Sequence, residues 1–283
     1  MAIRLEAWND SARQYDSFEK HWSFYGTVAD AMMEQLPVKK DSRVLELACG
    51  TGACTLKLAR AATAGKVVAL DFSGGMLDVA RENAASDRCS NVTFVHGDAG
   101  DVSQLLAGEA FDLAFCNSAF WHFPEPEKVL AGLLGLLTVQ GEFAFSLPSW
   151  VQGSETREAF RAKVREVLTR HGVTPEQMAT LSARRPRWRD DFGALLNNCG
   201  FEVEKESLFE FEVSPDSRRE WRGISVFSDS RGRSFPLPEM DVATQKEVRE
   251  ELEAWRRANV PMNPNSSKWT IIVARPSKGR PVP

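Results

Sequence analysis

Residues 43–54 read RVLELACGTGAC, an apolar run that passes directly into two glycines separated by one residue. The run predicts a buried strand, and the segment after Gly52 has the apolar spacing of a helix. Because glycine has no Cβ, a turn that contains Gly50 and Gly52 lets the backbone approach a ligand closely. The first helical turn beyond it offers N–H groups that have no partner within the helix. The stretch therefore predicts a ligand loop, although the same glycines also suit a plain tight turn.

The strand-then-helix pattern continues along the chain. Short apolar runs alternate with amphipathic segments, which is typical of a parallel sheet covered by helices on both faces. The strands that this pattern predicts are 43–47, 66–70, 91–95, 111–115, 142–146, 202–213 and 268–276. We expect a core made of 38–149, 190–213 and 268–276. The remaining segments predict a helical lid over one end of that core, formed by 1–37, 150–189 and 214–267, with a tail at 277–283.

Composition narrows the class of protein. The chain has 283 residues and a net charge of −4, and so lacks the basic footprint that binding to nucleic acid needs. No apolar run approaches the roughly 18 residues of a membrane helix, and the first residues have no apolar signal segment. The five cysteines are odd in number and show no CxxC spacing, which favours free thiols in a reducing compartment. We therefore expect a cytoplasmic protein without a nucleic-acid or membrane partner.

Two acidic residues follow the predicted strands next to the glycine loop. Asp71 ends the second strand, 21 residues after Gly50, where a carboxylate accepts hydrogen bonds from the hydroxyls of a ribose. A helix N-cap is the alternative role for Asp71, but Ser73 suits that role better. Asp98 follows the third strand and is placed to accept from an exocyclic amine such as that of adenine. The two acids predict a nucleoside site at one edge of the sheet.

The loop departs from the dinucleotide pattern. Thr55 stands where a third glycine allows close helix packing, and no Lys-Ser/Thr pair closes the loop as in a triphosphate P-loop. Glu46, just before the turn, would repel a pyrophosphate. A cofactor that joins adenosine to an ammonium or sulfonium end fits these residues better.

Four segments together resemble the successive motifs of class I S-adenosylmethionine-dependent methyltransferases. They are LELACGTG (45–52), ALDFSGGMLDVAREN (69–83), VHGDAGD (95–101) and FDLAFCNSAFWHFPEP (111–126). The chain is most similar to the branch that methylates small molecules, such as the quinone-biosynthesis methyltransferases, and the likeness covers about residues 40–150. It implies an α/β fold with a Rossmann-like, doubly wound, mostly parallel seven-stranded sheet whose last strand is antiparallel, and S-adenosylmethionine as cofactor.

The resemblance also implies roles for individual residues. The glycine loop would lie under the methionine portion, Asp71 would hold the ribose, Asp98 the adenine amine, and Tyr15 would close over the cofactor carboxylate. The full set of implied cofactor residues is Tyr15, Glu46, Ala48, Gly50, Gly52, Asp71, Phe72, Met76, Asp98, Ala99, Asn117 and Ser118. Gly74-Gly75 stands where the family commonly has a proline, a departure expected to loosen that turn.

His122 is the best candidate for a general base. Its unperturbed pKa of about 6.5 suits proton transfer at neutral pH, and it lies just beyond the fourth strand. The alternative is that His122 only packs under the lid or bonds the cofactor. His21, Tyr15 and Tyr25 are further candidates, and His96 is expected to be a core histidine.

Aromatic residues indicate the kind of substrate. Seven of the eight tryptophans lie outside the regular strands, which suits an apolar or aromatic ligand, although an aromatic lid core would look the same. The predicted substrate residues are Trp22, Tyr25, Trp121, His122 and Trp150. Four scattered histidines give no metal cluster.

These features predict methyl transfer to O, C or N of a small, largely apolar or aromatic acceptor. Transfer to O or C is slightly favoured because a candidate base is present. A cofactor-binding homologue with a regulatory or non-methylating role is the main alternative, and a nicotinamide-dependent oxidoreductase is the other. A homodimer is compatible with this interpretation.

Overall fold

Seven strands form one sheet within the residues that the computed structural model describes, which are 5–149, 155–178, 192–226, 240–259 and 265–277. Their order is β3-β2-β1-β4-β5-β7-β6. The strands β1 to β5 pair in parallel, and β7 is antiparallel to both β5 and β6. Their bounds are β1 Arg43–Leu47, β2 Lys66–Asp71, β3 Val92–His96, β4 Phe111–Cys116, β5 Leu137–Pro148, β6 Phe201–Glu212 and β7 Ser266–Pro276. The predicted doubly wound, mostly parallel fold with an antiparallel last strand is confirmed.

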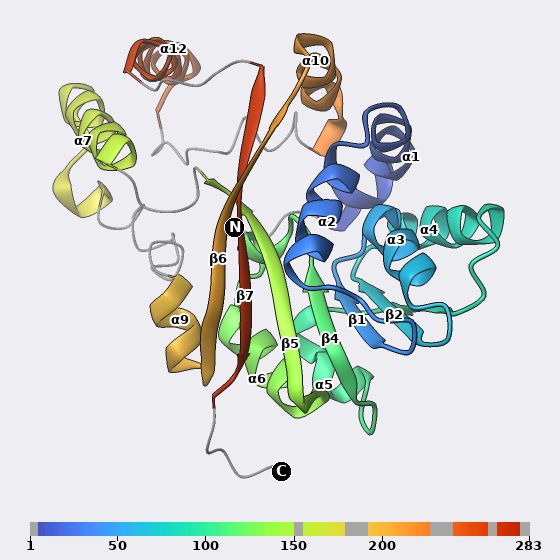
Figure 1. Cartoon of the computed structure of the whole chain (residues 1–283). Helices are drawn as coiled ribbons and strands as arrows, with labels where there is room; N and C mark the ends of the chain where they lie inside the picture. The colour runs from blue at the N-terminus through green and yellow to red at the C-terminus, as the bar shows by residue number, and fades with distance from the viewer. Residues whose placement is uncertain (1–4, 150–154, 179–191, 227–239, 260–264, 278–283) are drawn as a thin grey trace.

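Helices cover both faces of this sheet (Figure 1). Side chains of neighbouring strand residues point to opposite faces: Val44 packs with Met32 and Leu58, whereas Leu45 belongs to the cluster of Leu130 and Leu196. The described helices are α1 Leu5–Trp22, α2 Phe24–Gln35, α3 Ala53–Ala61, α4 Gly74–Ser86, α5 Val102–Leu105, α6 Pro126–Leu136, α7 Glu155–Arg170, α9 Phe192–Asn198, α10 Pro215–Gly223 and α12 Val242–Asn259, with short 3-10 helices η1 Ala99–Asp101 and η2 Phe120–His122. None of the described helices is long and apolar enough to cross a membrane.

The N-terminal helices lie beside the carboxyl ends of the parallel strands. α1 packs against α4 and α10, and α2 packs against α3 (Figure 1). The loops that follow β1, β2 and β4 open at the same edge of the sheet because these strands are parallel. The arrangement brings segments from both ends of the chain to the edge where the sequence predicts a site.

The helices α7 and α12 form a pair with an apolar cluster of their own. Val164, Leu168, Val248 and Leu252 are buried between them. The carboxylate of Glu251 on α12 pairs with Lys163 and Arg170 of α7. Both helices come from segments assigned above to a lid, and that division of the chain stays a prediction.

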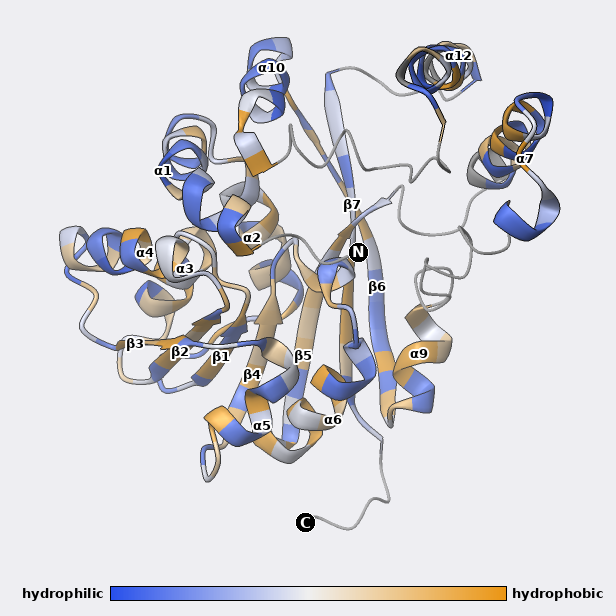
Figure 2. Cartoon of the chain, turned by 180° about the vertical axis from the view of Figure 1, so that it is seen from behind, coloured by the Kyte–Doolittle hydropathy of each residue, from blue (hydrophilic) through white to orange (hydrophobic). Residues whose placement is uncertain are grey.

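The strand β6 forms one edge of the sheet and is largely hydrophilic (Figure 2). Its sequence, FEVEKESLFEFE, places five glutamates along twelve residues. Glu204 pairs with Arg275, and Glu210 pairs with Lys268. Leu208 is an exposed apolar side chain on this strand.

Two local expectations differ from the structure. His96 is exposed rather than buried in the core, because β3 is the other edge strand; its Nε2 lies 3.0 Å from the carbonyl oxygen of Phe72. The free thiols are as predicted, but only Cys49, Cys54 and Cys116 are buried.

Candidate functional site

The turn after β1 adopts left-handed backbone conformations at alternate positions. The φ angles are 55° at Ala48, 55° at Gly50 and 91° at Gly52. Glycine accepts this region without strain, whereas Ala48 bears a cost because of its Cβ. A Cβ at Gly52 would make an ordinary van der Waals contact with the Cβ of Ala80 on α4, at 3.5 Å, so the positive φ rather than lack of space requires glycine there. The sequence therefore folds locally into a turn whose backbone is open to a ligand.

Asp71 ties β2 to this turn. Its side chain is 4% exposed and accepts hydrogen bonds from the backbone N–H of Gly50 at 2.8 Å and of Ser73 at 2.9 Å. Burial raises the pKa of Asp71 to about 6, against the lowering effect of these N–H groups. The carboxylate is thus held rigidly at the edge of the turn.

Glu46 lies beneath the same turn, near the end of β1. It is 1% exposed, and the hydroxyl of Thr55 donates to its Oε2 at 2.5 Å. Burial raises the pKa of Glu46 to about 8. A second buried carboxyl group therefore flanks the glycine loop, and a cationic ligand would stabilise its charged form.

The starts of α4 and η1 hold the other residues predicted on the nucleoside side. Met76 is buried beside Ala12 of α1, and Phe72 is half-buried. Asp98 is exposed and accepts from the backbone N–H of Gly100 at 2.7 Å, while Ala99 is buried. Asp71 and Asp98 follow neighbouring parallel strands, so their carboxylates lie along the same edge of the sheet.

Helix α1 is fastened across α4 by polar contacts that the sequence did not predict. The Oδ1 of Asn9 accepts from the hydroxyl of Ser73 at 2.7 Å and from the N–H of Gly75 at 3.0 Å. The amide of Asn83 donates to Asp16 at 2.7 Å. Ser73 also caps α4, so the turn expected to be loosened by its glycines is held at both ends.

A Cβ on Gly75 would lie 2.8 Å from the carbonyl oxygen of Asn9. Only glycine leaves room for α1 at this position.

Tyr15 of α1 lies over the glycine loop. Its ring carbon is 4.0 Å from the position that a Cβ of Gly50 would take. Burial raises the pKa of Tyr15 well above its usual value, and the acids Glu19, Asp71 and Glu46 add to the effect. The predicted cofactor residues Tyr15, Gly50, Asp71 and Glu46 are thus brought together.

The tip of β4 forms a hydrogen-bond network with β5 and α2. The Oδ1 of Asn117 accepts from the hydroxyls of Ser118 at 3.0 Å and Ser146 at 3.1 Å. The Nδ2 of Asn117 donates to the carbonyl oxygen of Tyr25 at 2.9 Å. Ser146 was not predicted from sequence, because it sits inside an otherwise apolar strand.

The start of α2 is fixed by Glu19 of α1. Its buried carboxylate accepts from the N–H groups of Tyr25 at 2.9 Å and Gly26 at 2.6 Å, which are free donors of the first helical turn. Ser23 between the helices has a φ of 47°, so the chain bends sharply there. Glu19, Asn117 and the bend together set the position of Tyr25.

Aromatic rings form a layer next to the hydrogen-bond network of Asn117. Tyr15 and Tyr25 stack with ring centroids 5.3 Å apart, and Trp269 of β7 lies 6.3 Å from Tyr25. The centroids of Trp121 and Trp269 are 5.8 Å apart, and His122 lies 4.8 Å from Trp121. The structure thus gathers three of the predicted substrate residues, Tyr25, Trp121 and His122. It also places Trp269 beside them, a residue that the sequence indicated only as part of a strand.

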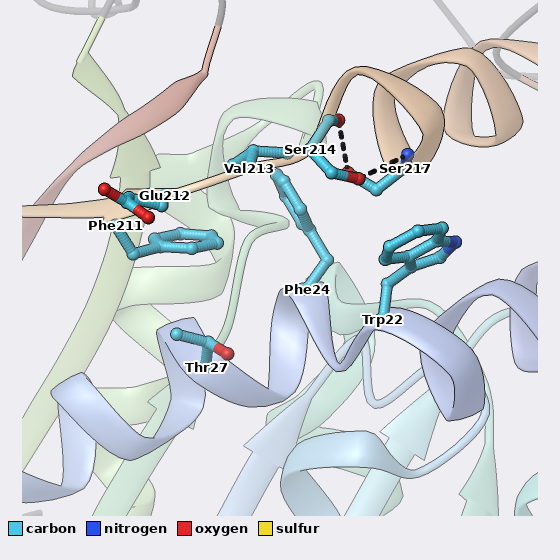
Figure 3. Close-up of a pocket in the computed structure, with 8 residues that line it drawn as sticks. All are labelled: Trp22, Phe24, Thr27, Phe211, Glu212, Val213, Ser214 and Ser217. Carbon is cyan, nitrogen blue, oxygen red and sulfur yellow. Dashed lines mark hydrogen bonds between the residues drawn. The ribbon is translucent and has the colours of Figure 1, made fainter.

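Trp22 faces a different pocket (Figure 3). This outer pocket, of about 260 Å³, is lined by Trp22, Phe24, Thr27, Phe211, Glu212, Val213, Ser214 and Ser217. The indole of Trp22 donates to Glu220 of α10 at 2.7 Å. Trp150 lies outside the described residues. Among the described residues, no group of three or more His, Cys, Asp or Glu side chains is placed to hold a metal ion.

Comparison with known proteins identifies the family. A family described as "Methyltransferase domain" matches residues 38–200. A demethylmenaquinone methyltransferase of Clavibacter sepedonicus is 40% identical over 109 residues, which are 38% of this chain and 42% of the relative. A malonyl-[acyl-carrier protein] O-methyltransferase of Priestia megaterium is 26% identical over 141 residues, 49% of this chain and 48% of the relative. The chain therefore spans about half or less of these curated relatives.

The likeness in fold extends further than the likeness in sequence. The crystal structure of the YcgJ protein of Bacillus subtilis superposes with a TM-score of 0.56 at 15% identity, covering 89% of this chain and 98% of that chain. At such a low identity, the comparison shows a shared fold and nothing about activity. The family match covers more than half of the residues and includes the glycine loop, Asp71, Asp98 and the tip of β4. The chain belongs to the methyltransferase domain family.

Proposed function

We propose that the protein transfers a methyl group from S-adenosylmethionine to O, C or N of a small, largely apolar or aromatic acceptor. The observation that carries this proposal is the pair of buried carboxyl groups, Glu46 and Asp71, on either side of a left-handed glycine loop. The named activity of one relative, on demethylmenaquinone, supports a small-molecule acceptor. The other relative is named for malonyl-[acyl-carrier protein], in which a protein carries the methylated group. Five free thiols fit a cytoplasmic protein, and a homodimer is a further expectation.

The residues of the site fit this cofactor. Asp71 would receive the ribose hydroxyls, and Phe72 and Met76 would line the adenine. Asp98 and Ala99 would meet the exocyclic amine. Glu46, below the loop of Ala48, Gly50 and Gly52, would face the ammonium of the methionine portion, with Tyr15, Asn117 and Ser118 around it.

When bound, S-adenosylmethionine supplies a methyl group on a sulfonium, which a nucleophile displaces in line. The chain mainly positions the partners and excludes water, and such positioning contributes up to about 7–11 kcal/mol in favourable cases. The stacked rings of Tyr15 and Tyr25 lie over the loop and exclude water there. His122, half-buried beside Trp121, would take a proton from a hydroxyl or an activated carbon of the acceptor.

Replacement of Asp71 tests the cofactor site. Asp71→Ala should weaken binding of S-adenosylhomocysteine at least about tenfold, because two ribose hydrogen bonds are lost. Isothermal calorimetry measures this directly. Asp71→Asn keeps an oxygen for one of the Gly50 and Ser73 N–H groups and turns an NH2 group toward the other, so it should retain one of the two bonds and still bind weakly. Asp78→Ala, on the exposed side of α4, is the control. Unchanged affinity in both Asp71 variants would disprove the ribose role.

Replacement of His122 tests the base. With labelled cofactor and a panel of phenols, quinones and amines, His122→Gln should lower turnover by about 10²-fold or more and leave cofactor affinity unchanged. His171→Gln, in the turn that follows α7, is the control. Full activity of His122→Gln would reduce this residue to packing.

A further inference from the structure

One hydrogen bond joins two segments that lie far apart in the sequence. The Nε1–H of Trp221, on α10, donates to the hydroxyl oxygen of Tyr25, on α2, at 2.8 Å. Helix α10 belongs to the segment between β6 and β7, whereas α2 lies near the N-terminus. The bond therefore fastens the C-terminal segment to the aromatic layer above the glycine loop.

The direction of this bond constrains the Tyr25 hydroxyl. An indole N–H is a donor only, so the oxygen of Tyr25 accepts, and its own hydrogen must point elsewhere. The other hydrogen bonds of Tyr25 use its backbone, with Glu19 and Asn117 as partners. Among the described residues, none accepts the hydroxyl hydrogen of Tyr25. A buried donor without an acceptor costs free energy, and a bound ligand that accepts from it recovers that cost.

The ring that carries this hydroxyl has little freedom. Tyr25 is 7% exposed; its ring stacks on Tyr15 at an interplanar angle of 12° and meets Phe24 and Trp269 edge-on. Burial also raises the pKa of Tyr25 far above neutrality, so the hydroxyl keeps its hydrogen at physiological pH. Tyr25 is thus a fixed hydrogen-bond donor next to the ring that covers Gly50.

The surroundings limit what this donor can meet. Three acids, Glu19, Glu46 and Asp71, act on Tyr15 and Tyr25. Of these, Asp71 has a pKa of about 6 and is mostly ionised at pH 7, so it disfavours a further anionic group on the acceptor. An ammonium group has no lone pair to accept a hydrogen bond. A neutral oxygen on a flat, apolar ring system satisfies both the donor and the aromatic layer.

We propose that Tyr25 donates a hydrogen bond to a neutral carbonyl or hydroxyl oxygen of an aromatic methyl acceptor, and that Trp221 is a positioning residue that aims this donor. The proposal rests on the proposed function, because it assigns a substrate class to the same site. Tyr25 touches the acceptor, whereas Trp221 acts through Tyr25. Amine and carboxylate acceptors are the classes that it excludes.

Two probes of similar shape test the oxygen preference. Binding of 2-naphthol and of 2-methylnaphthalene to the protein saturated with S-adenosylhomocysteine is measured by calorimetry. Tyr25→Phe keeps the ring and removes the donor, so 2-naphthol should bind about fivefold or more weakly, while 2-methylnaphthalene is unaffected. Trp221→Phe should weaken 2-naphthol binding by a smaller factor. The double variant should be no weaker than Tyr25→Phe, because the hydroxyl that Trp221 would aim is already missing.

Trp255→Phe is the matched control. Its ring lies 5.8 Å from that of Phe160, in the separate apolar cluster of α7 and α12. This variant should bind both probes as the unmodified protein does.

Equal weakening of both probes in Tyr25→Phe, or strictly additive effects in the double variant, would overturn the assignment. So would failure of 2-naphthol to bind the unmodified protein in its S-adenosylhomocysteine complex. If S-adenosylhomocysteine itself does not bind, the proposed function fails; if it binds and the probes are not discriminated, only the present inference fails.

Discussion

At the scale of single residues, Glu46 has the largest chemical consequence. It is buried under the glycine loop, with the hydroxyl of Thr55 as a partner, and its pKa is raised to about 8. At pH 7 the carboxyl group is therefore mostly protonated in the ligand-free protein. A positive charge placed nearby would favour the ionised form and expel the proton.

Cofactor binding should accordingly release a proton near pH 7. Titration with S-adenosylmethionine in two buffers of different ionisation enthalpy, such as phosphate and Tris, should show release of up to about one proton per site. Glu46→Gln should abolish that difference and weaken binding by about tenfold. Glu34→Gln, on α2 and remote from the loop, serves as control. A buffer-independent enthalpy for the unmodified protein would contradict the placement of the ammonium next to Glu46.

The sequence predicted residues whose role follows from their position in a motif. Gly50 and Asp71 stand at strand ends, and parallel strands bring such ends together whatever the rest of the fold does. Ser146 and Trp269 gave no such signal, since an isolated serine or tryptophan in an apolar strand looks like core. Their contacts, with Asn117 and Trp121, depend on which strands become neighbours.

At the scale of elements, the contact of α1 with α4 depends on a single missing Cβ. The two glycines at the start of α4, Gly74 and Gly75, differ in the space around them. At Gly74 a Cβ would meet nothing within 4 Å, whereas at Gly75 it would lie 2.8 Å from the carbonyl oxygen of Asn9. The two positions therefore form a natural pair of variants.

Gly75→Ala should displace α1 and cost about 1–3 kcal/mol of stability, because backbone cannot yield as a side-chain end can. Binding of S-adenosylhomocysteine should weaken several-fold, since Tyr15 moves with α1. Gly74→Ala should be neutral or stabilising by up to about 1 kcal/mol, as alanine favours the helix. Urea unfolding and calorimetry measure both effects. Identical behaviour of the two variants would show that α1 does not rest on this contact.

The strands were predictable because short, fully apolar runs between amphipathic segments rarely adopt any other secondary structure. β3 was correctly located but its burial was overestimated, because an edge position cannot be read from five residues. The bend at Ser23 was also not predicted: Glu19 caps a helix that begins after it, a contact that requires α1 and α2 to be packed already.

At the scale of the whole molecule, three buried acids link stability to pH. Burial raises the pKa of Glu19 to about 7, of Glu46 to about 8 and of Asp71 to about 6. Each folded-state pKa lies above its unfolded value, so the folded protein binds more protons in this range. The stability that these groups contribute is present below about pH 4 and is lost as the pH rises through the folded values.

The ligand-free protein should therefore lose about 2 kcal/mol or more of its unfolding free energy between about pH 5 and pH 8. Glu19→Gln should flatten part of this slope, since glutamine does not titrate and keeps an acceptor for one of the Tyr25 and Gly26 N–H groups. Urea denaturation at several pH values measures the slope. Glu6→Gln, exposed on the same helix, should leave it unchanged. A stability that rises across this range would contradict the burial of these acids.

The acidic edge strand β6 has a consequence for how the molecules behave toward one another. An unpaired strand offers a row of N–H and C=O groups on which another chain can add, and charged side chains are a common protection against this. Glu202, Glu204, Glu206, Glu210 and Glu212 supply that protection along β6. Replacement of these glutamates by glutamine would leave the exposed side chain of Leu208 beside an uncharged edge. Such variants would then aggregate strand to strand even where the fold itself persists, so loss of these charges should lower solubility more than stability.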